Sequence, residues 1–226
     1  MSKASYGVDA PGVVMGFAAG GLVSLALCYY TFWWLASAAW FFWSAASMLR
    51  GSFRGKFKVR DRLLDFLSLQ GSEKVLDVGC GRGLILLGAA KRLPGGKAVG
   101  VDIWQTKDQS GNSPETTLRN AAAEGVSGRI ELNTADAAKL PFDSSFFDAV
   151  TSSLAIHNIP KADARAAAIR EMVRVLKPGG KLAVYDIFHV GEYEKTLAES
   201  GMKEIVKSKR IGAFYKDNLL TALKPN

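Results

Sequence analysis

Cysteine and histidine are scarce in this chain of 226 residues, which has two of each. Cys28 lies in an apolar run and Cys80 lies in a glycine-rich turn, so neither belongs to a CxxC pair or to a metal-ligand spacing. The sequence therefore predicts neither a disulfide framework nor a metal site. A reducing compartment fits this use of cysteine best.

Charge is absent from one long stretch, because no Asp, Glu, Lys or Arg occurs between Asp9 and Arg50. A bilayer core needs about 20 apolar helical residues, so residues 13–49 predict a transmembrane anchor. Residues 28–31 contain neither proline nor glycine, which favours one long spanning helix over a re-entrant helical hairpin. The apolar run is too long for a cleavable signal peptide, so we expect an uncleaved anchor that contacts the lipid bilayer.

Positive charge follows this apolar run directly. The chain has 29 Lys and Arg against 21 Asp and Glu, and several of the basic residues fall within residues 50–62. The positive-inside rule then predicts an integral membrane protein with its catalytic domain on the cytoplasmic side. We expect residues 50–58 to form a basic linker that binds anionic lipid headgroups, and we expect no nucleic acid partner. Gly16 and Gly20 have the GxxxG spacing that allows a homodimer of membrane helices.

The stretch VLDVGCGRG, residues 75–83, is the clearest motif. Its apolar start predicts a buried strand, and its glycines predict a tight turn that opens a helix at Leu84. Such a turn admits a nucleotide because glycine lacks a Cβ atom and the helix start presents unpaired NH groups. A dinucleotide fingerprint would need glycine at Leu84, which disfavours a nicotinamide enzyme. Asp102 ends the next predicted strand, where its carboxylate is placed to accept from both ribose hydroxyls.

Five segments carry a family resemblance, and they follow one another in the family's order over about two thirds of the chain. They are KVLDVGCGRG, AVGVDI, NTADAAKLPF, SSFFDAVTSSLAIHNI and REMVRVLKPGGKLAVYD. In these segments the sequence resembles the class I S-adenosylmethionine-dependent methyltransferases, in particular the ubiquinone/menaquinone and sterol methyltransferases.

The resemblance implies an α/β fold: a Rossmann-like, seven-stranded, mostly parallel sheet with helices on both faces. It also implies a C-terminal antiparallel hairpin, which we place in residues 203–210 and 213–223. The expected domains are a short N-terminal segment (1–12), the anchor (13–49), the linker (50–58) and a methyltransferase domain (59–226).

The resemblance further implies S-adenosyl-L-methionine as cofactor. Asp136 is expected to accept from the adenine amino group, Ala137 to offer its backbone NH to the ring, and Ser153 to line the methionine end. The whole expected binding set is Asp77, Gly79, Cys80, Gly81, Gly83, Asp102, Ile103, Asp136, Ala137 and Ser153. The polar loop 104–112 either folds over the adenosine, forms part of the substrate mouth, or is only a solvated loop.

Methyl transfer from a sulfonium depends mainly on alignment of donor and acceptor. His157, just beyond the fourth predicted strand, is the candidate general base for a small-molecule acceptor; a packing or orienting role is the alternative. An anchor would favour a lipophilic, membrane-resident acceptor. The alternatives are a soluble acceptor, or a methyltransferase-fold protein that binds cofactor or a partner without turnover. Asp77 and Asp102 count against a pure adaptor, which has no need of them.

Overall fold

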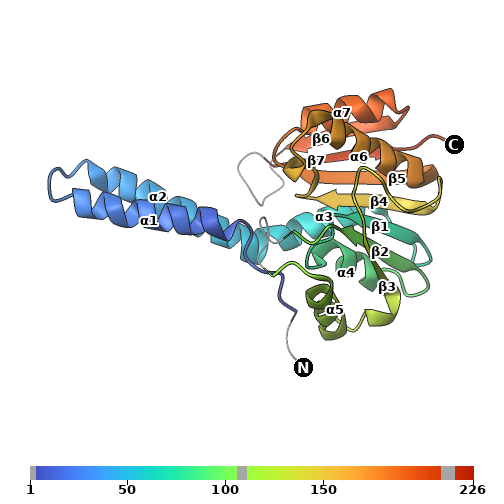
Figure 1. Cartoon of the computed structure of the whole chain (residues 1–226), viewed down its shortest axis with the longest axis horizontal. Helices are drawn as coiled ribbons and strands as arrows, with labels where there is room; N and C mark the ends of the chain where they lie inside the picture. The colour runs from blue at the N-terminus through green and yellow to red at the C-terminus, as the bar shows by residue number, and fades with distance from the viewer. Residues whose placement is uncertain (1–3, 106–110, 210–216) are drawn as a thin grey trace.

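The computed structural model describes residues 4–105, 111–209 and 217–226. It shows an α/β domain from which a pair of helices projects (Figure 1). The strands are β1 Lys74–Val78, β2 Lys97–Asp102, β3 Ile130–Thr134, β4 Phe147–Ser153, β5 Leu176–Asp186, β6 Lys203–Lys209 and β7 Asn218–Leu223. The α-helices are α1 Pro11–Leu27, α2 Trp34–Arg50, α3 Lys56–Leu67, α4 Leu84–Lys91, α5 Pro114–Ala123, α6 Ala162–Val175 and α7 Val190–Glu199.

The strands form one seven-stranded sheet in the order β3-β2-β1-β4-β5-β7-β6. The first five strands pair in parallel, while β7 is antiparallel to both β5 and β6. The predicted Rossmann-like sheet and its C-terminal antiparallel hairpin are therefore confirmed. Residues 210–216, which include the start of the second predicted hairpin strand, lie outside the described residues.

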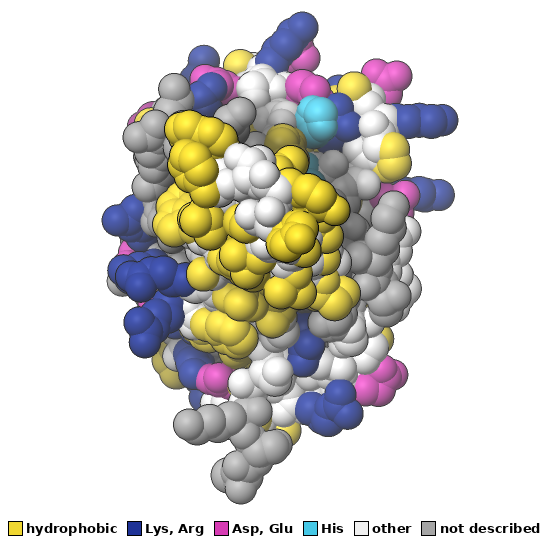
Figure 2. Space-filling view, turned by 90° about the vertical axis from the view of Figure 1, so that its left-hand side faces the viewer, with side chains coloured by type: hydrophobic (Ala, Val, Ile, Leu, Met, Phe, Trp, Pro, Cys, Tyr) yellow, Lys and Arg dark blue, Asp and Glu magenta, His cyan; other side chains and the backbone are white. Residues whose placement is uncertain are grey.

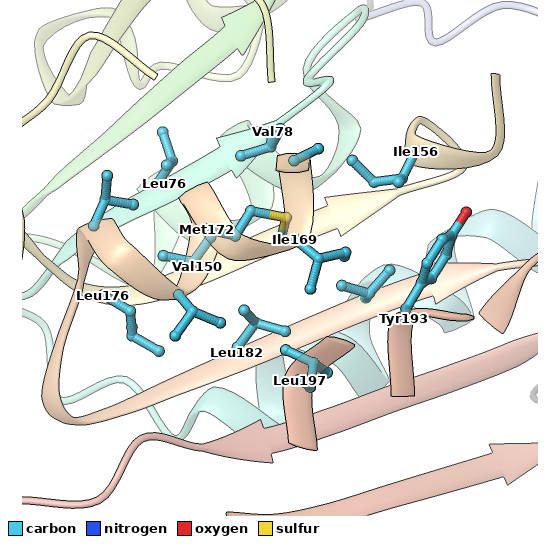
Figure 3. Packing of buried hydrophobic residues seen from close by; sticks show 14 of the residues in the cluster. Leu76, Val78, Val150, Ile156, Ile169, Met172, Leu176, Leu182, Tyr193 and Leu197 are labelled. Carbon is cyan, nitrogen blue, oxygen red and sulfur yellow. The ribbon is translucent and has the colours of Figure 1, made fainter. Parts of the chain in front are cut away.

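Alternate residues of the central strands face two separate cores. Val75 of β1 packs with residues of α3 and α4 on one face, and its neighbour Leu76 packs with residues of α6 and α7 on the other. The second core is shown in Figure 3, where Met172 of α6 and Leu197 of α7 lie over β4 and β5. Strands buried on both faces explain why their sequences are continuously apolar rather than alternating.

The N-terminal apolar stretch does not form the expected single spanning helix. The chain reverses between α1 and α2, where the NH groups of Cys28, Tyr30 and Thr31 bond back to carbonyls of the preceding helical turn. The result is an antiparallel helical hairpin, the alternative that the sequence left open. Among the described residues, no helix combines the length and the apolar character needed to cross a bilayer, so the predicted transmembrane anchor is not supported. Each helix has 17 residues, about 25 Å at 1.5 Å per residue, against a hydrocarbon core of about 30 Å.

Glycine lets the two helices of this hairpin approach closely. A Cβ atom on Gly20 would lie 2.9 Å from the ring of Phe41, and one on Gly21 would lie 2.8 Å from the ring of Phe42. Gly20 thus serves a contact within the chain, whereas a Cβ atom on Gly16 would meet no atom within 4 Å. A homodimer through Gly16 and Gly20 stays a prediction.

Helix α2 continues without a break into the domain. A π-helical turn, Gly51–Gly55, joins α2 to α3, and the residues at both junctions have helical backbone angles. Residues 50–58, expected to form a linker, are therefore helical. Since α3 packs on the sheet, the hairpin is joined to the domain through a continuous helix.

We predict that Leu182→Ala lowers the free energy of unfolding by about 2–5 kcal/mol, because it leaves a cavity between β5 and α6 where Leu182 is fully buried. Leu118→Ala is the matched control, since Leu118 is 50% exposed and should change stability by less than about 0.5 kcal/mol. Urea unfolding followed by circular dichroism measures both. Equal losses in the two variants would contradict the assigned core.

Candidate active site

The glycine turn lies where the sheet reverses its strand order. Strands β1 and β4 are neighbours, with β2 and β3 on one side and β5 on the other, and ligands of open α/β sheets bind at the carboxyl ends of such a strand pair. Gly79 follows β1 with φ 73°, and a Cβ atom there would lie 2.1 Å from the Cβ of Ala155, just after β4. Gly79 therefore brings the turn against the loop that follows β4, and no other residue fits.

The turn is fixed by bonds to the next strand and to α5. The NH groups of Gly79 and Cys80 donate to the Val101 carbonyl at 2.7 and 3.1 Å. The Thr117 hydroxyl donates to the Gly81 carbonyl at 2.6 Å. Gly83 has φ 86° and forms the N-cap of α4, which has no side-chain cap. The NH groups that begin α4, other than that of Leu86, are thus left for a ligand.

Cys80 packs beneath the turn rather than presenting a reactive thiol. Its side chain is buried, and a Cβ atom on Gly100 would lie 2.8 Å from its Sγ. Burial raises the pKa of the Cys80 thiol well above its usual value, so the thiolate is strongly disfavoured. This placement agrees with a small residue that fills a tight turn.

Asp77 is the buried acid beneath the turn. Its carboxylate accepts from the Leu86 NH at 3.0 Å and from the Thr151 hydroxyl at 3.0 Å. Burial, partly offset by these hydrogen bonds, raises the pKa of Asp77 to about 7. Asp77, expected among the cofactor-binding residues, lies inside the protein. There it holds the end of β1, the start of α4 and strand β4 together.

Asp102 ends β2, as expected, and its carboxylate contacts the glycine turn. One carboxylate oxygen accepts from the Gly81 NH at 2.8 Å, and the other accepts from the Trp104 NH at 2.6 Å and the Asn112 amide at 3.3 Å. A carboxylate offers about four lone-pair positions, so one remains after these three bonds. Ile103 is 54% exposed beside it, an apolar surface for a flat ring.

The remaining expected cofactor residues lie after β3 and β4. Asp136 is exposed, and its Oδ1 accepts from the Ala138 NH at 2.8 Å, which fixes the loop while the other oxygen stays open to solvent. Ala137 is half-buried against the second core. Ser153 is the last residue of β4 and pairs in register with Tyr185 of β5. All three therefore lie at the same carboxyl edge of the sheet as Gly79 and Asp102.

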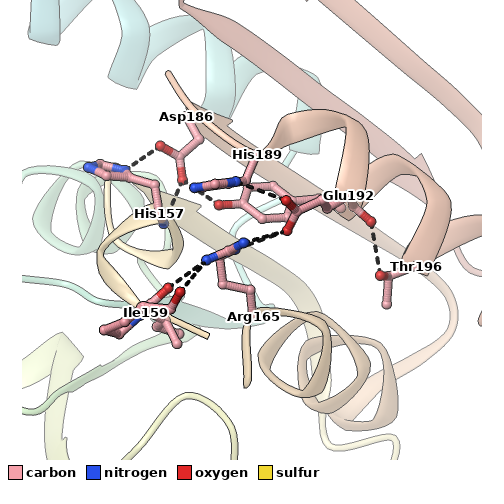
Figure 4. A network of polar contacts seen from close by, with 9 residues as sticks. His157, Ile159, Arg165, Asp186, His189, Glu192 and Thr196 are labelled. Carbon is pink, nitrogen blue, oxygen red and sulfur yellow. Dashed lines mark hydrogen bonds and ion pairs between the residues drawn. The ribbon is translucent and has the colours of Figure 1, made fainter. Parts of the chain in front are cut away.

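His157 and Asp186 form a hydrogen-bonded pair at this edge (Figure 4). His157 lies in the 3₁₀ turn Ile156–Asn158 after β4, and its Nδ1 contacts the Oδ1 of Asp186, the fully buried last residue of β5. The Asp186 carboxylate also accepts from the backbone NH of His157 at 3.2 Å and from the Tyr193 hydroxyl at 3.3 Å. Because Nδ1 of His157 contacts Asp186, Nε2 is the ring nitrogen that remains to contact a substrate. No residue in the described ranges binds this Nε2.

Arg165 of α6 secures the loop that carries His157. Its guanidinium is buried, donates to the carbonyls of Ile159 and Pro160 at 2.9 and 3.0 Å, and binds Glu192 of α7 at 2.8 Å. His189 contacts the same Glu192 carboxylate through its Nδ1 at 2.9 Å (Figure 4). The Arg165 contacts orient the loops after β4 and β5 relative to each other.

Comparison with known proteins agrees with this arrangement. Residues 76–184 match the family described as "Methyltransferase domain". Over this part of the chain, the sequence is similar to the class I S-adenosylmethionine-dependent methyltransferases. A sterol 4-C-methyltransferase of Caenorhabditis elegans is 35% identical over 57% of this chain, and a ubiquinone/menaquinone biosynthesis C-methyltransferase of Cereibacter sphaeroides is 34% identical over 56%. The alignments cover only 35% and 47% of those two relatives.

A solved structure has the same fold. The S-adenosylmethionine-dependent methyltransferase of Aquifex aeolicus superposes with a TM-score of 0.61 at 18% identity, over 75% of this chain and 93% of that chain. Identity this low supports the shared fold alone.

The segment that covers the glycine turn is not predicted from the sequence. The Ser5 NH donates to Asn120 of α5 at 2.9 Å, and Asn120 in turn donates to the carbonyls of Ser5 and Arg82. Lys56 donates to the carbonyls of Tyr6 and Gly7 at 3.0 and 2.7 Å. These contacts join a buried lysine and an asparagine to backbone carbonyls far away in the chain, and no sequence pattern marks such contacts.

Strained backbone also gathers at this edge. Three non-glycine residues with positive φ follow the carboxyl ends of strands: Trp104 after β2, Leu154 after β4 and His189 after β5. Each costs on the order of 1–3 kcal/mol and persists only where the surrounding contacts enforce it. Trp104 belongs to the predicted 104–112 loop, of which residues 106–110 lie outside the described part of the chain.

We predict that the stability of the protein relative to Asp77→Asn falls as pH rises from 5 to 8. The folded-state pKa of about 7 lies above the unfolded value of about 4, so the neutral carboxyl contributes fully below pH 4, and this contribution is lost as pH rises through 7. Asparagine keeps an acceptor for the Leu86 NH without titrating. Urea unfolding of both proteins at each pH should show a change on the order of 1 kcal/mol or more. A constant difference between them would contradict the assignment.

Proposed function

We propose that the methyltransferase domain transfers the methyl group of S-adenosylmethionine to a small organic acceptor that must lose a proton, such as a hydroxyl or an acidic C–H. The observation that carries the proposal is the His157–Asp186 pair at the sheet edge that also bears the glycine turn. S-adenosylmethionine supplies the electrophilic methyl. The protein supplies alignment and a base, and general bases contribute typically about 10²–10⁴-fold.

The cofactor sulfur and His157 account for the bonding electrons and the proton of the proposed methyl transfer. The acceptor atom forms a bond to the methyl carbon while the carbon–sulfur bond breaks, and the sulfur takes the bonding electron pair. His157 Nε2 takes the acceptor's proton, and Asp186 stabilises the imidazolium through Nδ1. The glycine turn, Asp102 and the loop with Asp136 would hold the nucleoside, as the positions of their side chains and NH groups allow.

The acceptor class is the finer part of the proposal. The two curated relatives are named for sterol and for quinone C-methylation, which supports a lipophilic acceptor. This chain spans less than half of either relative, so a water-soluble acceptor is an equal candidate. A panel of sterols, quinols and water-soluble phenols separates the two classes by which of them yields S-adenosylhomocysteine. Cofactor binding with no product from any of them would favour a binding protein without turnover.

We predict that Asp102→Ala weakens S-adenosylmethionine binding by about 10–100-fold, because hydrogen bonds to a charged group contribute about 1.5–3 kcal/mol each. Glu131→Ala on β3 is the control, since it removes an exposed acid of the neighbouring strand and should leave the affinity unchanged. Titration calorimetry measures both, and circular dichroism checks that the Gly81 and Trp104 contacts are not needed for folding. Unaltered affinity in a folded Asp102→Ala protein would contradict the role.

We predict that His157→Ala lowers kcat by at least about 100-fold while leaving the affinity for S-adenosylmethionine within about twofold, since a general base acts on the acceptor only. His189→Asn is the matched control: asparagine tolerates the positive φ at that position, and turnover should persist. Asp186→Asn should lower kcat without lowering cofactor affinity. Turnover that survives in His157→Ala would show that this histidine is only a packing residue.

A further inference from the structure

The hairpin, residues 11–50, has no role in the proposed reaction, yet it holds most of the exposed large apolar side chains of the described chain. Seen end-on in Figure 2, these side chains gather at the centre of one face of the molecule. Its exposed apolar residues are Val13, Met15, Leu22, Val23, Leu25, Tyr29, Tyr30, Phe32, Trp33, Trp34, Leu35, Trp40, Phe42 and Trp43. Apolar surface of this extent marks a contact with a protein or a membrane.

The apolar side chains surround the hairpin instead of forming one stripe. On α1, Val13, Met15 and Leu25 are 44–67% exposed, and the 100° step of a helix turns them in three different directions. A protein partner covers one face of a helix pair. A helix that is apolar on all sides is stable in an apolar environment, which is either a protein core or a membrane interior.

Two side chains of the hairpin donate hydrogen bonds to carbonyls within it. Ser24 is buried between the helices, and its carbonyl accepts from the Cys28 thiol at 3.4 Å. The Ser44 hydroxyl donates to the Trp40 carbonyl at 2.8 Å. Hydrogen bonds made within the hairpin suit a hydrocarbon environment, because lipid chains offer no hydrogen-bond partners.

Charge is arranged as an anionic membrane would require. No acid occurs from residue 10 to residue 60, and the base of the hairpin carries three exposed cations, Arg50, Arg54 and Lys58, on successive turns of the continuous helix. Phe53 lies among them and is 62% exposed. Basic residues at a membrane surface contribute about 1 kcal/mol each on anionic lipid.

We propose that the hairpin inserts tip first into an anionic lipid bilayer, with both of its ends on one side of the membrane. Aromatic residues at the tip enter the lipid, and the cations at the base meet the headgroups. This docking stands apart from the proposed reaction, because neither depends on the other for its chemistry. A second copy of the chain is the rival occupant, but copies that meet through their hairpins would also bring these cations together.

Insertion would place the candidate site beside the membrane surface. The segment that leads into α1 lies over the glycine turn, where a Cβ atom on Gly7 would lie 2.8 Å from the Arg82 guanidinium. Lys56, just after the hairpin, binds the Gly7 carbonyl. The hairpin base is thus next to the carboxyl edge of the sheet and projects away from it (Figure 1).

Vesicle flotation of the full chain tests the proposal. On vesicles of phosphatidylcholine with one quarter phosphatidylglycerol, most of the protein should float, and Leu22→Glu should weaken binding by at least about tenfold, since a charge in hydrocarbon is costly. Leu118→Glu is the matched control, because Leu118 is similarly exposed on α5 and should leave binding unchanged. The triple variant Arg50→Ala, Arg54→Ala and Lys58→Ala should remove most of the preference for anionic over pure phosphatidylcholine vesicles.

Tryptophan fluorescence gives a second measurement. Four of the five tryptophans, Trp33, Trp34, Trp40 and Trp43, lie in the hairpin, so acyl chains carrying bromine should quench most of the emission. A protein that remains at the bottom of the gradient overturns the proposal, as does a dimer in solution that Leu22→Glu dissociates without any vesicle binding. S-adenosylmethionine titration of the same samples keeps failure of docking distinct from failure of the proposed function.

Discussion

A single desolvated carboxyl group organises the α/β domain. Asp77 has almost no solvent contact to offset its charge, and its two hydrogen bonds go to different elements, the NH of Leu86 in α4 and the hydroxyl of Thr151 in β4. Losing either partner would leave a buried polar group unpaired, at a cost of about 1–3 kcal/mol. The distance between β1, β4 and the start of α4 is thereby fixed, and so is the path of the glycine turn between them.

The parts of the site that follow from local chemistry are predictable from sequence. The turn after β1 needs glycine where φ is positive and where Ala155 comes within contact, and Asp102 ends a strand that must lie beside β1. The resemblance implies the sheet and its C-terminal antiparallel β-hairpin, and the structure confirms both. The turn between α1 and α2 escapes prediction because residues 28–33 reverse the chain without proline or glycine. The reversal packs Gly20 and Gly21 against Phe41 and Phe42 of α2, contacts between residues about twenty positions apart in the chain.

The partner of His157 is out of reach of sequence reasoning for a different reason. Nothing in the sequence joins Asp186 to His157, because sequence alone does not give the register of β4 against β5. That register pairs Ser153 with Tyr185, so the residues just beyond each strand meet at the edge. The left-handed Leu154 and His189 turn the chain immediately after these strands. Strain of this kind is invisible in sequence because neither residue is a glycine, and it positions the loops that carry the pair.

The buried Lys56–Asp9 pair connects the hairpin to this site. Burial lowers the pKa of Lys56 and raises that of Asp9, and each charge offsets the cost of the other at 3.6 Å. Lys56 starts α3, while Asp9 immediately precedes the entry to α1, so the pair closes the base of the hairpin. Lys56 also binds the segment that covers the glycine turn. Since α2 runs through a π-helical turn into α3, Lys56 lies on the same continuous helix as the hairpin and also contacts the segment that covers the glycine turn.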